Sequence, residues 1–375
     1  MVLFAVVLSP VMSAALPAQA STRTSRVECR LSDPRIDEAS GIARGIRSPG
    51  VLYVENDSGD VNRFFAVDRR TCATAAVVTV PGAANVDWED LAAAPDAQGT
   101  PSVWLADIGD NDEIRSSVEV YRVDEPRIAA GSRDRAVKAA TADEWRLRYP
   151  DGAHNAESFA VTPDGVGYIV TKSVLGQSEV FRLPAKPDRR RVQTLQRVGA
   201  IPFNPTGTDD PFGMPGELTA TGAAFSRNGA VFAVRTYSDA YFWPVRDGDL
   251  ADALKSAPKR VALPRQRQGE GIALDGDHVL LDSEGVGTSI DTIAAPRLAT
   301  PSVPRGTSPA TDSRATPALA SGSAAAQSPS ATGSSSSASG SKGGSGSWLP
   351  GLVILALALV GAGAWWIAQL RRPAR

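Results

Sequence analysis

A six-residue pattern of polar and apolar positions occurs five times along the chain. Its first and third positions are polar, its fifth is apolar and its sixth is alanine in every copy. The third positions, residues 40, 89, 157, 221 and 270, are 49, 68, 64 and 49 residues apart. This spacing approximates one four-stranded blade, so the pattern predicts a β-propeller in which each copy is an innermost strand.

Further strands are predicted from the apolar runs, bounded by turn residues, that follow each copy of the pattern. Fourth strands are expected at 75–80, 145–149, 192–201 and 259–263. The fifth copy lacks a fourth strand, and the segment upstream of the first copy, about 26–31, is expected to supply it and close the ring. We therefore expect an all-β, five-bladed propeller over residues 21–296. Six blades are the alternative, but they require a copy that the sequence does not contain.

Equivalent positions on the inner strands should form rings around the central axis. The third positions give one ring: Ser40, Glu89, Glu157, Thr221 and Glu270. The first positions give a second ring: Glu38, Asp87, Asn155, Thr219 and Gln268. Three carboxylates in one ring repel one another unless they take up protons or share a cation. Because all these ligands are oxygens, a hard cation such as Ca²⁺ fits better than zinc. A metal-free channel filled with water and hydrogen-bonded side chains is the alternative.

The turns after the second strands should rim the same mouth of the channel. They carry residues of both charges: Asp57, Asp107, Lys172, Arg235 and Glu284. Such a mouth could hold an anionic ligand against a central cation. The acids are also explained by turn conformation alone, and the two basic residues by surface or blade-to-blade salt bridges.

The two ends of the chain predict export and a membrane anchor. Residues 1–20 are apolar and end in Ala-Gln-Ala, which indicates a signal peptide, although the usual basic start is missing. Residues 297–347, rich in Ser, Ala, Gly and Pro, predict a disordered stalk. Residues 348–370 are apolar over a bilayer's width and predict a transmembrane helix, and the basic tail 371–375 places that end in the cytoplasm. The propeller is then extracellular.

Charge and cysteine content narrow the function further. The net charge is −2, from 39 basic and 41 acidic residues, and no long basic run is present, which argues against a nucleic-acid partner. The two cysteines, Cys29 and Cys72, are expected to form a disulfide in an exported domain. Two free thiols are the alternative.

Conventional catalytic groups are scarce. The chain has two histidines, and it has no Gly-x-Ser-x-Gly motif in the propeller region. His278, at a strand start, is interpreted as structural, whereas His154 directly precedes the third copy and is a candidate catalytic or ligand residue. An enzyme built on this chain would use metal-assisted chemistry, with Asp57, Asp107 or Glu38 as the base.

Four phrases, at residues 38–41, 56–59, 85–90 and 107–111, resemble those of secreted bacterial propellers described as WD40-like or as having the esterase-like activity of phytase. The resemblance covers about residues 30–295. The ring order Ser, Glu, Glu, hydroxyl, Glu is similar to the central calcium site of calcium-activated apyrases, which are five-bladed nucleotide diphosphatases. That resemblance implies Ca²⁺ at the first ring, with Thr221 where the apyrase pattern has a serine. Nucleotide hydrolysis is not implied, because only the ring and the turn at 56–59 match.

These observations lead to two functional hypotheses. The first is a membrane-anchored extracellular propeller with a central Ca²⁺ that serves as a cell-surface binding or interaction module. Its ligand is unidentified, and the mixed-charge mouth suggests an anion. The alternative is a Ca²⁺-dependent hydrolase of phosphate esters, anhydrides or other esters that acts at the channel mouth.

Overall fold

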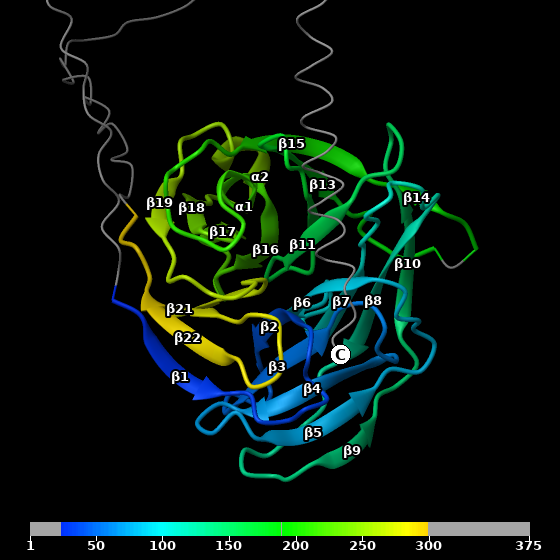
Figure 1. The fold of residues 1–375 in the computed structure, drawn as a ribbon. Coiled ribbons are helices and arrows are strands. Elements are labelled where there is room, and N and C mark those ends of the chain that lie inside the picture. Colours follow the sequence, from blue (N-terminus) through cyan, green and yellow to red (C-terminus); the bar gives the residue numbers. More distant parts are fainter. Residues whose placement is uncertain (1–23, 189, 299–375) are drawn as a thin grey trace, which may run out of the picture. The chain divides into compact units, whose positions relative to one another are not determined.

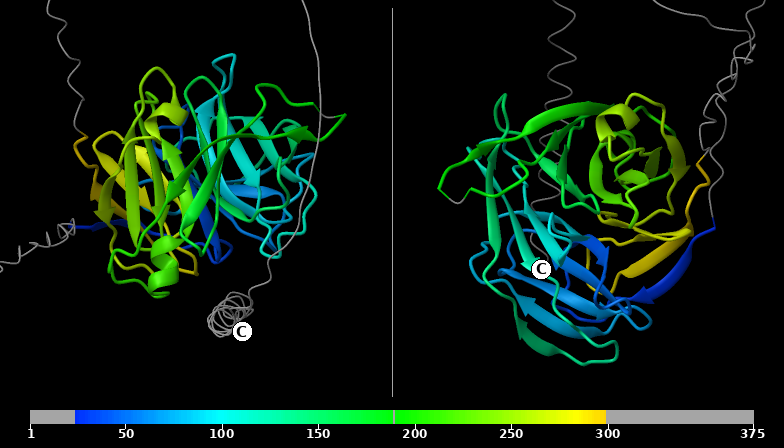
Figure 2. Two further views of the ribbon diagram at one scale, coloured as in Figure 1. Left: turned by 90° about the horizontal axis from the view of Figure 1, so that it is seen from above. Right: turned by 180° about the vertical axis from the view of Figure 1, so that it is seen from behind.

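The computed structural model describes residues 24–188 and 190–298, which form 22 strands and two short helices within those ranges. Five sheets, antiparallel except for the outermost strands of two of them, are arranged around one axis (Figures 1 and 2). No helix of the described ranges is long and apolar enough to cross a membrane. The predicted signal peptide, transmembrane helix, basic tail and nearly all of the predicted stalk lie outside these ranges.

Blades one and two each contain five strands. From the axis outward, blade one contains β2 (Ala39–Arg44), β3 (Val51–Asn56), β4 (Arg63–Asp68), β5 (Thr74–Thr79) and β9 (Arg135–Lys138). Blade two contains β6 (Trp88–Pro95), β7 (Pro101–Asp107), β8 (Val118–Asp124), β10 (Asp143–Arg148) and β14 (Gln193–Thr194).

Blades three, four and five contain four strands each. Blade three contains β11 (Ala156–Val161), β12 (Gly167–Thr171), β13 (Gln177–Arg182) and β15 (Gln196–Pro202). Helix α1 (Met214–Leu218) precedes blade four, which contains β16 (Ala220–Phe225), β17 (Val231–Thr236), β18 (Asp239–Pro244) and, after helix α2 (Leu250–Ala253), β19 (Lys259–Ala262). Blade five contains β20 (Ile272–Asp275), β21 (His278–Leu281), β22 (Ser289–Ala294) and β1 (Arg26–Arg30).

The ring closes through the N-terminal strand, as the sequence predicts. β1 pairs antiparallel with β22 and becomes the outermost strand of blade five. The five inner strands contact one another in sequence, and β20 of the last blade returns to β2 of the first. Five copies of the pattern therefore make five blades, and the six-bladed alternative is wrong.

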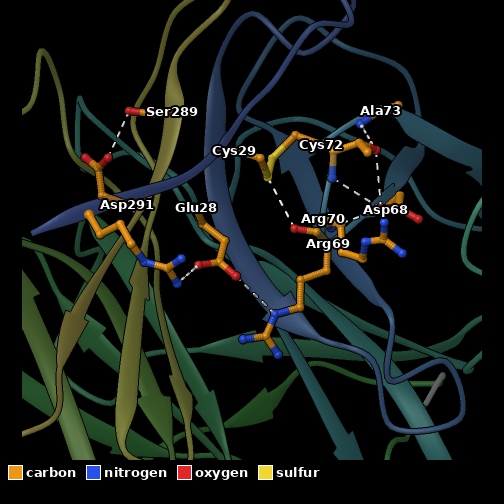
Figure 3. Close-up of a disulfide and its surroundings, with 11 residues drawn as sticks. Glu28, Cys29, Asp68, Arg69, Arg70, Cys72, Ala73, Ser289 and Asp291 are labelled. Carbon is orange, nitrogen blue, oxygen red and sulfur yellow. Dashed lines mark hydrogen bonds and ion pairs between the residues drawn. A yellow bond between two sulfur atoms is a disulfide. The ribbon is translucent and has the colours of Figure 1, made fainter.

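A disulfide fastens this closure. Cys29 in β1 is bonded to Cys72, 43 residues later, in the turn between β4 and β5 of blade one (Figure 3). Arg69 of the same turn pairs with Glu28 at 3.6 Å and with Asp275 of β20 at 2.5 Å. The predicted disulfide is confirmed, and it joins the last blade to the first at the seam where the two ends of the propeller meet.

The outer edges of blades one and two differ from the prediction. The expected fourth strand at 192–201 is divided: β14 pairs parallel with β10 of blade two, and only β15 belongs to blade three. β9 likewise adds to β5 of blade one in parallel. These segments cover exposed sheet edges, whose unpaired backbone groups would otherwise face solvent. Their amino-acid pattern alone does not show which edge they cover.

Packing between blades forms the core. Trp88 is fully buried among side chains of blades one and two, including Tyr53 and Tyr121. Its indole nitrogen donates to the Ala84 carbonyl at 2.6 Å. Trp88 is thus wedged between two blades, and it fixes the start of β6, which carries Glu89 and Asp90.

Candidate cation site at the channel mouth

The repeated polar third position coincides with a β-bulge. In blade two the ladder pairs Trp88 with Asp107 and Asp90 with Ala106, which leaves Glu89 as the extra residue. Glu157 and Thr221 are the extra residues of blades three and four in the same way. A bulge re-aims a side chain out of the ordinary alternation of a strand. The sequence pattern therefore encodes one bulge per inner strand in these blades, and the bulges direct polar groups toward the channel.

The two hydroxyls of this ring link neighbouring blades. The Ser40 hydroxyl donates to the Glu89 carbonyl at 2.7 Å. The Thr221 hydroxyl contacts the carbonyls of Gly269 and Glu270 at 3.0 and 3.1 Å. Both side chains thus bond to backbone carbonyls at or next to the third position of the pattern in the next blade.

Lys172 is a cation that the chain itself supplies to the ring. It follows β12, is 9% exposed, and forms an ion pair with Glu157. Its ammonium lies 6.0 Å from the centre of the Tyr237 ring. Its positive charge also opposes the upward shift in the pKa values of Glu89 and Glu270. One of the three glutamates is thereby paired internally, whereas Glu89 and Glu270 form no ion pair within the described ranges.

Three carboxylates converge on that side. One oxygen from each of Asp57, Asp87 and Glu89 lies within 4.8 Å of the others. They come from the turn after β3, the loop before β6 and the bulge in β6. Burial, followed by the charges of neighbouring acids, raises the pKa values of Asp57 and Glu89 well above their ordinary values. Three charged carboxylates at this separation also repel one another, and protons or a shared cation would relieve the repulsion.

Asp107 positions one member of this triad. Its carboxylate accepts the backbone N–H groups of Val86 and Asp87, each at 3.1 Å. Arg115 pairs with Asp107 at 2.8 Å and so holds the carboxylate in place. Asp107 is fully buried, and it orients the loop of Asp87.

Further polar groups around the triad lack partners. Glu270 is 2% exposed, and its Oε2 atom has no hydrogen-bond partner. The buried hydroxyl of Tyr237 has none either. The pKa values of Tyr237 and Glu284 are both raised, first by burial and then by the charge of Glu270. Buried polar atoms without partners are uncommon and often mark a place for an ion or ordered water.

The strand register shows which residues rim the mouth. Asn56, Asp107, Thr171 and Thr236 occupy equivalent positions in blades one to four, opposite the residues that precede the bulges. The next residues are accordingly Asp57, Ile108, Lys172 and Tyr237. Tyr237 thus occupies the position in blade four for which the sequence nominated Arg235. Aligning Thr236-Tyr237 with Thr171-Lys172 would have found it.

Two of the nominated basic and catalytic residues serve other contacts. Arg235 is fully buried and donates to the Gly271 carbonyl at 3.1 Å and to Gln266 at 3.0 Å, which links blades four and five. His154 contacts Asp151 at 2.9 Å and packs against Tyr149. The triad is composed of other residues.

The second predicted ring is divided among different roles. Asp87 belongs to the triad. The pKa of Glu38 is raised by burial and by the charge of Asp37. The remaining three form local hydrogen bonds: Asn155 accepts from the Asp110 amide at 2.9 Å, Thr219 donates to the Pro215 carbonyl at 2.7 Å, and Gln268 donates to Glu284 at 2.6 Å.

The carboxylate of Asp90, at the fourth position of the pattern, is fully buried next to the site and connects neighbouring blades. Asp90 Oδ2 accepts the backbone N–H groups of Phe159 at 2.8 Å and Ala223 at 3.1 Å, so it joins blades two, three and four. Glycine occupies this position in blades one, four and five, and in blade one a Cβ on Gly41 would lie 2.5 Å from the Leu91 nitrogen and 2.9 Å from Oδ1 of Asp90. Sequence reasoning missed Asp90 because the fourth position varies among Gly, Asp and Ser.

The channel also makes stability depend on pH. Burial raises the pKa of Asp282 from 3.8 to about 7, although the charge of Arg235 opposes the shift. Because the folded state holds this proton more tightly than the unfolded chain, the stabilisation is complete below about pH 4 and is lost as the pH rises to about 7.

We therefore expect the melting temperature in EGTA to fall between about pH 5 and pH 7. Asp282→Asn keeps an acceptor for the Gly271 N–H, a 2.6 Å bond in the structure, but cannot titrate. It should reduce the fall by about 1–2 kcal/mol of unfolding free energy. Asp124→Asn, which changes an exposed carboxylate, is the control. Equal slopes in the wild type and Asp282→Asn would contradict the assignment.

Comparisons with known proteins add little to this picture. No family model matches the chain, and no curated protein matches its sequence. The chain is similar to the PQQ-bound aldose sugar dehydrogenase of Streptomyces coelicolor, with a TM-score of 0.39 and 12% identity over 74% of this chain and 99% of that one. A glucose dehydrogenase structure gives a TM-score of 0.38 and 12% identity over 73% of this chain and 100% of that one. Similarity at this level carries no conclusion about activity, and the resemblances to phytase-like and apyrase propellers stay hypotheses.

Proposed function

We propose that this propeller is a Ca²⁺-dependent binding module whose cation lies at the channel mouth. The observation that carries the proposal is the convergence of Asp57, Asp87 and Glu89 within 4.8 Å. Glu270, with its unpartnered Oε2, is a further candidate ligand. Ca²⁺ accepts six to eight oxygen ligands in irregular geometry, whereas Mg²⁺ requires a near-octahedral set. An all-oxygen set contributed by loops and bulges suits Ca²⁺ better.

This proposal shifts the cation away from the centre of the predicted ring. The sequence nominated Ser40, Glu89, Glu157, Thr221 and Glu270 as ligands. The hydroxyls of Ser40 and Thr221 bond to backbone carbonyls, and Lys172 pairs with Glu157. The negative charge that still needs a counter-ion lies toward Asp57 and Asp87, so we place the ion on that side.

The chemistry of the mouth also bears on the ligand. The acids at the mouth outnumber Lys172, so an anion would be repelled unless a bound cation attracted it. We propose an anionic ligand that binds through the cation and is released by EGTA. The disulfide agrees with an exported protein, and anchoring of the propeller outside the cell by residues 348–370 remains part of the proposal. The hydrolase stays a hypothesis, because no contact in the described residues favours it over binding.

A melting curve of the full chain in detergent tests the cation. Starting in EGTA, addition of Ca²⁺ to about 100 times its dissociation constant should add about 2.7 kcal/mol of stability. For a folded unit of this size we expect a rise of about 5–10 °C. Mg²⁺ and Mn²⁺ should produce smaller shifts at equal concentration.

Asp87→Asn identifies the site. It removes one ligand charge and should abolish most of the Ca²⁺ shift, while the melting temperature in EGTA stays equal or rises because repulsion within the triad is relieved. Glu144→Gln is the matched control, since it changes a partly buried carboxylate in β10. It should keep the full Ca²⁺-induced rise in melting temperature. No shift with any metal, or an undiminished shift in Asp87→Asn, would overturn the proposal.

A further inference from the structure

The exposed apolar side chains of the propeller gather at one end. Eight large apolar side chains are exposed within residues 24–188 and 190–298, and seven of them lie at the channel mouth. Five of the seven follow the second strand of a blade: Val61, Ile114, Val174, Leu175 and Val286. The other two, Val86 and Met214, lie in segments that lead into inner strands. We call these seven side chains the apolar tips.

The sheet topology shows that these segments share one end of the propeller. Each inner strand begins at the mouth, so antiparallel pairing returns the chain to the mouth after the second strand and again before the next inner strand. Asp57 and Asp87 of the triad lie in the same two kinds of segment. The loops at the far end carry no exposed large apolar side chain among the described residues. Single exposed apolar residues are ordinary, but their confinement to one end indicates a contact surface.

The tips project from the core into water. Leu175 is 82% exposed and Ile114 is 78% exposed, so neither buries appreciable apolar area in the folded propeller. Val286 lies between Gly285 and Gly287, whose φ angles are 110° and 76°. Such positive φ angles favour glycine and make a tight turn that projects the side chain between them. These side chains contribute little to stability, and a partner that buries them would explain their placement.

The arrangement of the tips favours a lipid bilayer over a protein as that partner. The tips are aliphatic, whereas the residues that dominate protein interfaces are enriched in Trp, Tyr and Arg. They are also distributed around a polar mouth, and lipid headgroups can fill the polar space while separate tips enter the apolar layer beneath. The sequence agrees, since a flexible segment such as 297–347 spans about 40 Å on average before the apolar residues 348–370.

We propose that the channel mouth docks on an anionic lipid bilayer, with a Ca²⁺ ion joining the acidic triad to lipid headgroups and the apolar tips entering the interface. This inference rests on the proposed function and names its anionic ligand. Without the cation, Asp57, Asp87 and Glu89 would repel anionic headgroups. Docking should therefore require Ca²⁺ and anionic lipid together.

A site-specific label on the full chain, reconstituted in liposomes, tests the docking. Both native cysteines form the disulfide, so one introduced cysteine can carry an NBD fluorophore alone. Leu175→Cys and Ile114→Cys place the label at tips, and Gln98→Cys, exposed in the loop between β6 and β7, places it at the far end as the control.

The lipid composition separates docking from other effects of Ca²⁺. In phosphatidylcholine containing one-fifth phosphatidylserine, Ca²⁺ should increase the NBD emission at both tips and shift it to shorter wavelength, and EGTA should reverse the change. The tip labels should not respond in phosphatidylcholine alone, and the label at residue 98 should respond in neither bilayer. No response at either tip, an equal response at residue 98, or an equal response without phosphatidylserine would overturn the proposal.

Two variants distinguish docking from cation binding. Leu175→Ser, with the label at residue 114, should raise the Ca²⁺ concentration for half-maximal response about tenfold, because burial of a leucine contributes at least that factor. It should keep the Ca²⁺-induced rise in melting temperature in detergent, whereas Asp87→Asn should lose both. Asn228→Ser, exposed at the far end, should change neither. A rise in melting temperature without a response at the tips would overturn the docking alone, and the absence of both would overturn the cation site as well.

Discussion

Asp90→Ala is expected to lower the free energy of unfolding by about 3–5 kcal/mol. Asp90 accepts the backbone N–H groups of Leu91 at 2.8 Å, of Phe159 and of Ala223. Alanine would leave these buried donors without an acceptor, and each buried unpaired donor costs about 1–3 kcal/mol. Removing a buried carboxylate offsets part of this cost, because burial raises the pKa of Asp90 well above its ordinary value.

Urea unfolding followed by tryptophan fluorescence measures this effect. Asp90→Asn keeps one acceptor oxygen and should lose less stability than Asp90→Ala. Asp124→Ala, at an exposed position of β8, should lie within about 0.5 kcal/mol of the wild type. If Asp90→Ala unfolded at the urea concentration of the wild type, the hydrogen bonds from Asp90 to blades two, three and four would not contribute to stability.

Replacing both cysteines by serine is expected to cost about 4 kcal/mol. The bond joins residues separated by 43 positions, and the chain-entropy model gives this value for a loop of that length. The cost should appear mainly as faster opening of the seam, because β1 is then held by its pairing with β22 in blade five and by the ion pair of Glu28 with Arg69 of blade one. The expected drop in melting temperature is about 8–12 °C.

Thermal melting and limited proteolysis test this prediction together. The double variant should be cut near β1 under conditions in which the wild type is resistant, and a reducing agent should make the wild type behave like the variant. A single Cys72→Ser variant serves as the control for the side-chain change and should lose the same stability. A double variant that melts within 2 °C of the wild type would contradict the prediction.

The fold could be predicted because the repeat is a local property. Each copy places a polar residue and an alanine at fixed positions at or near an inner strand, so five copies specify five blades. The closing strand was also predictable, since blade five lacked a partner and Cys29 lay in the segment upstream of the first copy. The edge strands β9 and β14 could not be predicted. They have only four and two residues, respectively, and such short segments carry no periodicity that distinguishes one sheet edge from another.

The candidate site was predicted in part. The sequence nominated Asp57, Asp87 and Glu89, and the structure brings these three together. It also nominated Arg235 for the mouth, but the strand register places Tyr237 there. A shift of two residues at the end of a strand changes which side chain reaches the axis. Because a bulge adds a residue to one strand, positions counted along the sequence do not give the strand register.

The sequence by itself determined the number of blades, the seam closed by Cys29 and Cys72, and the oxygen-rich character of the channel, because each depends on residue spacing along the chain. Only the tertiary structure decided which acids converge, that Lys172 neutralises Glu157, and that Asp90 joins three blades. These contacts connect residues far apart in sequence, and their geometry follows from how the blades pack around the axis. The five sixth-position alanines illustrate both levels, since the repeat specifies them and the closed ring gathers them around one cavity.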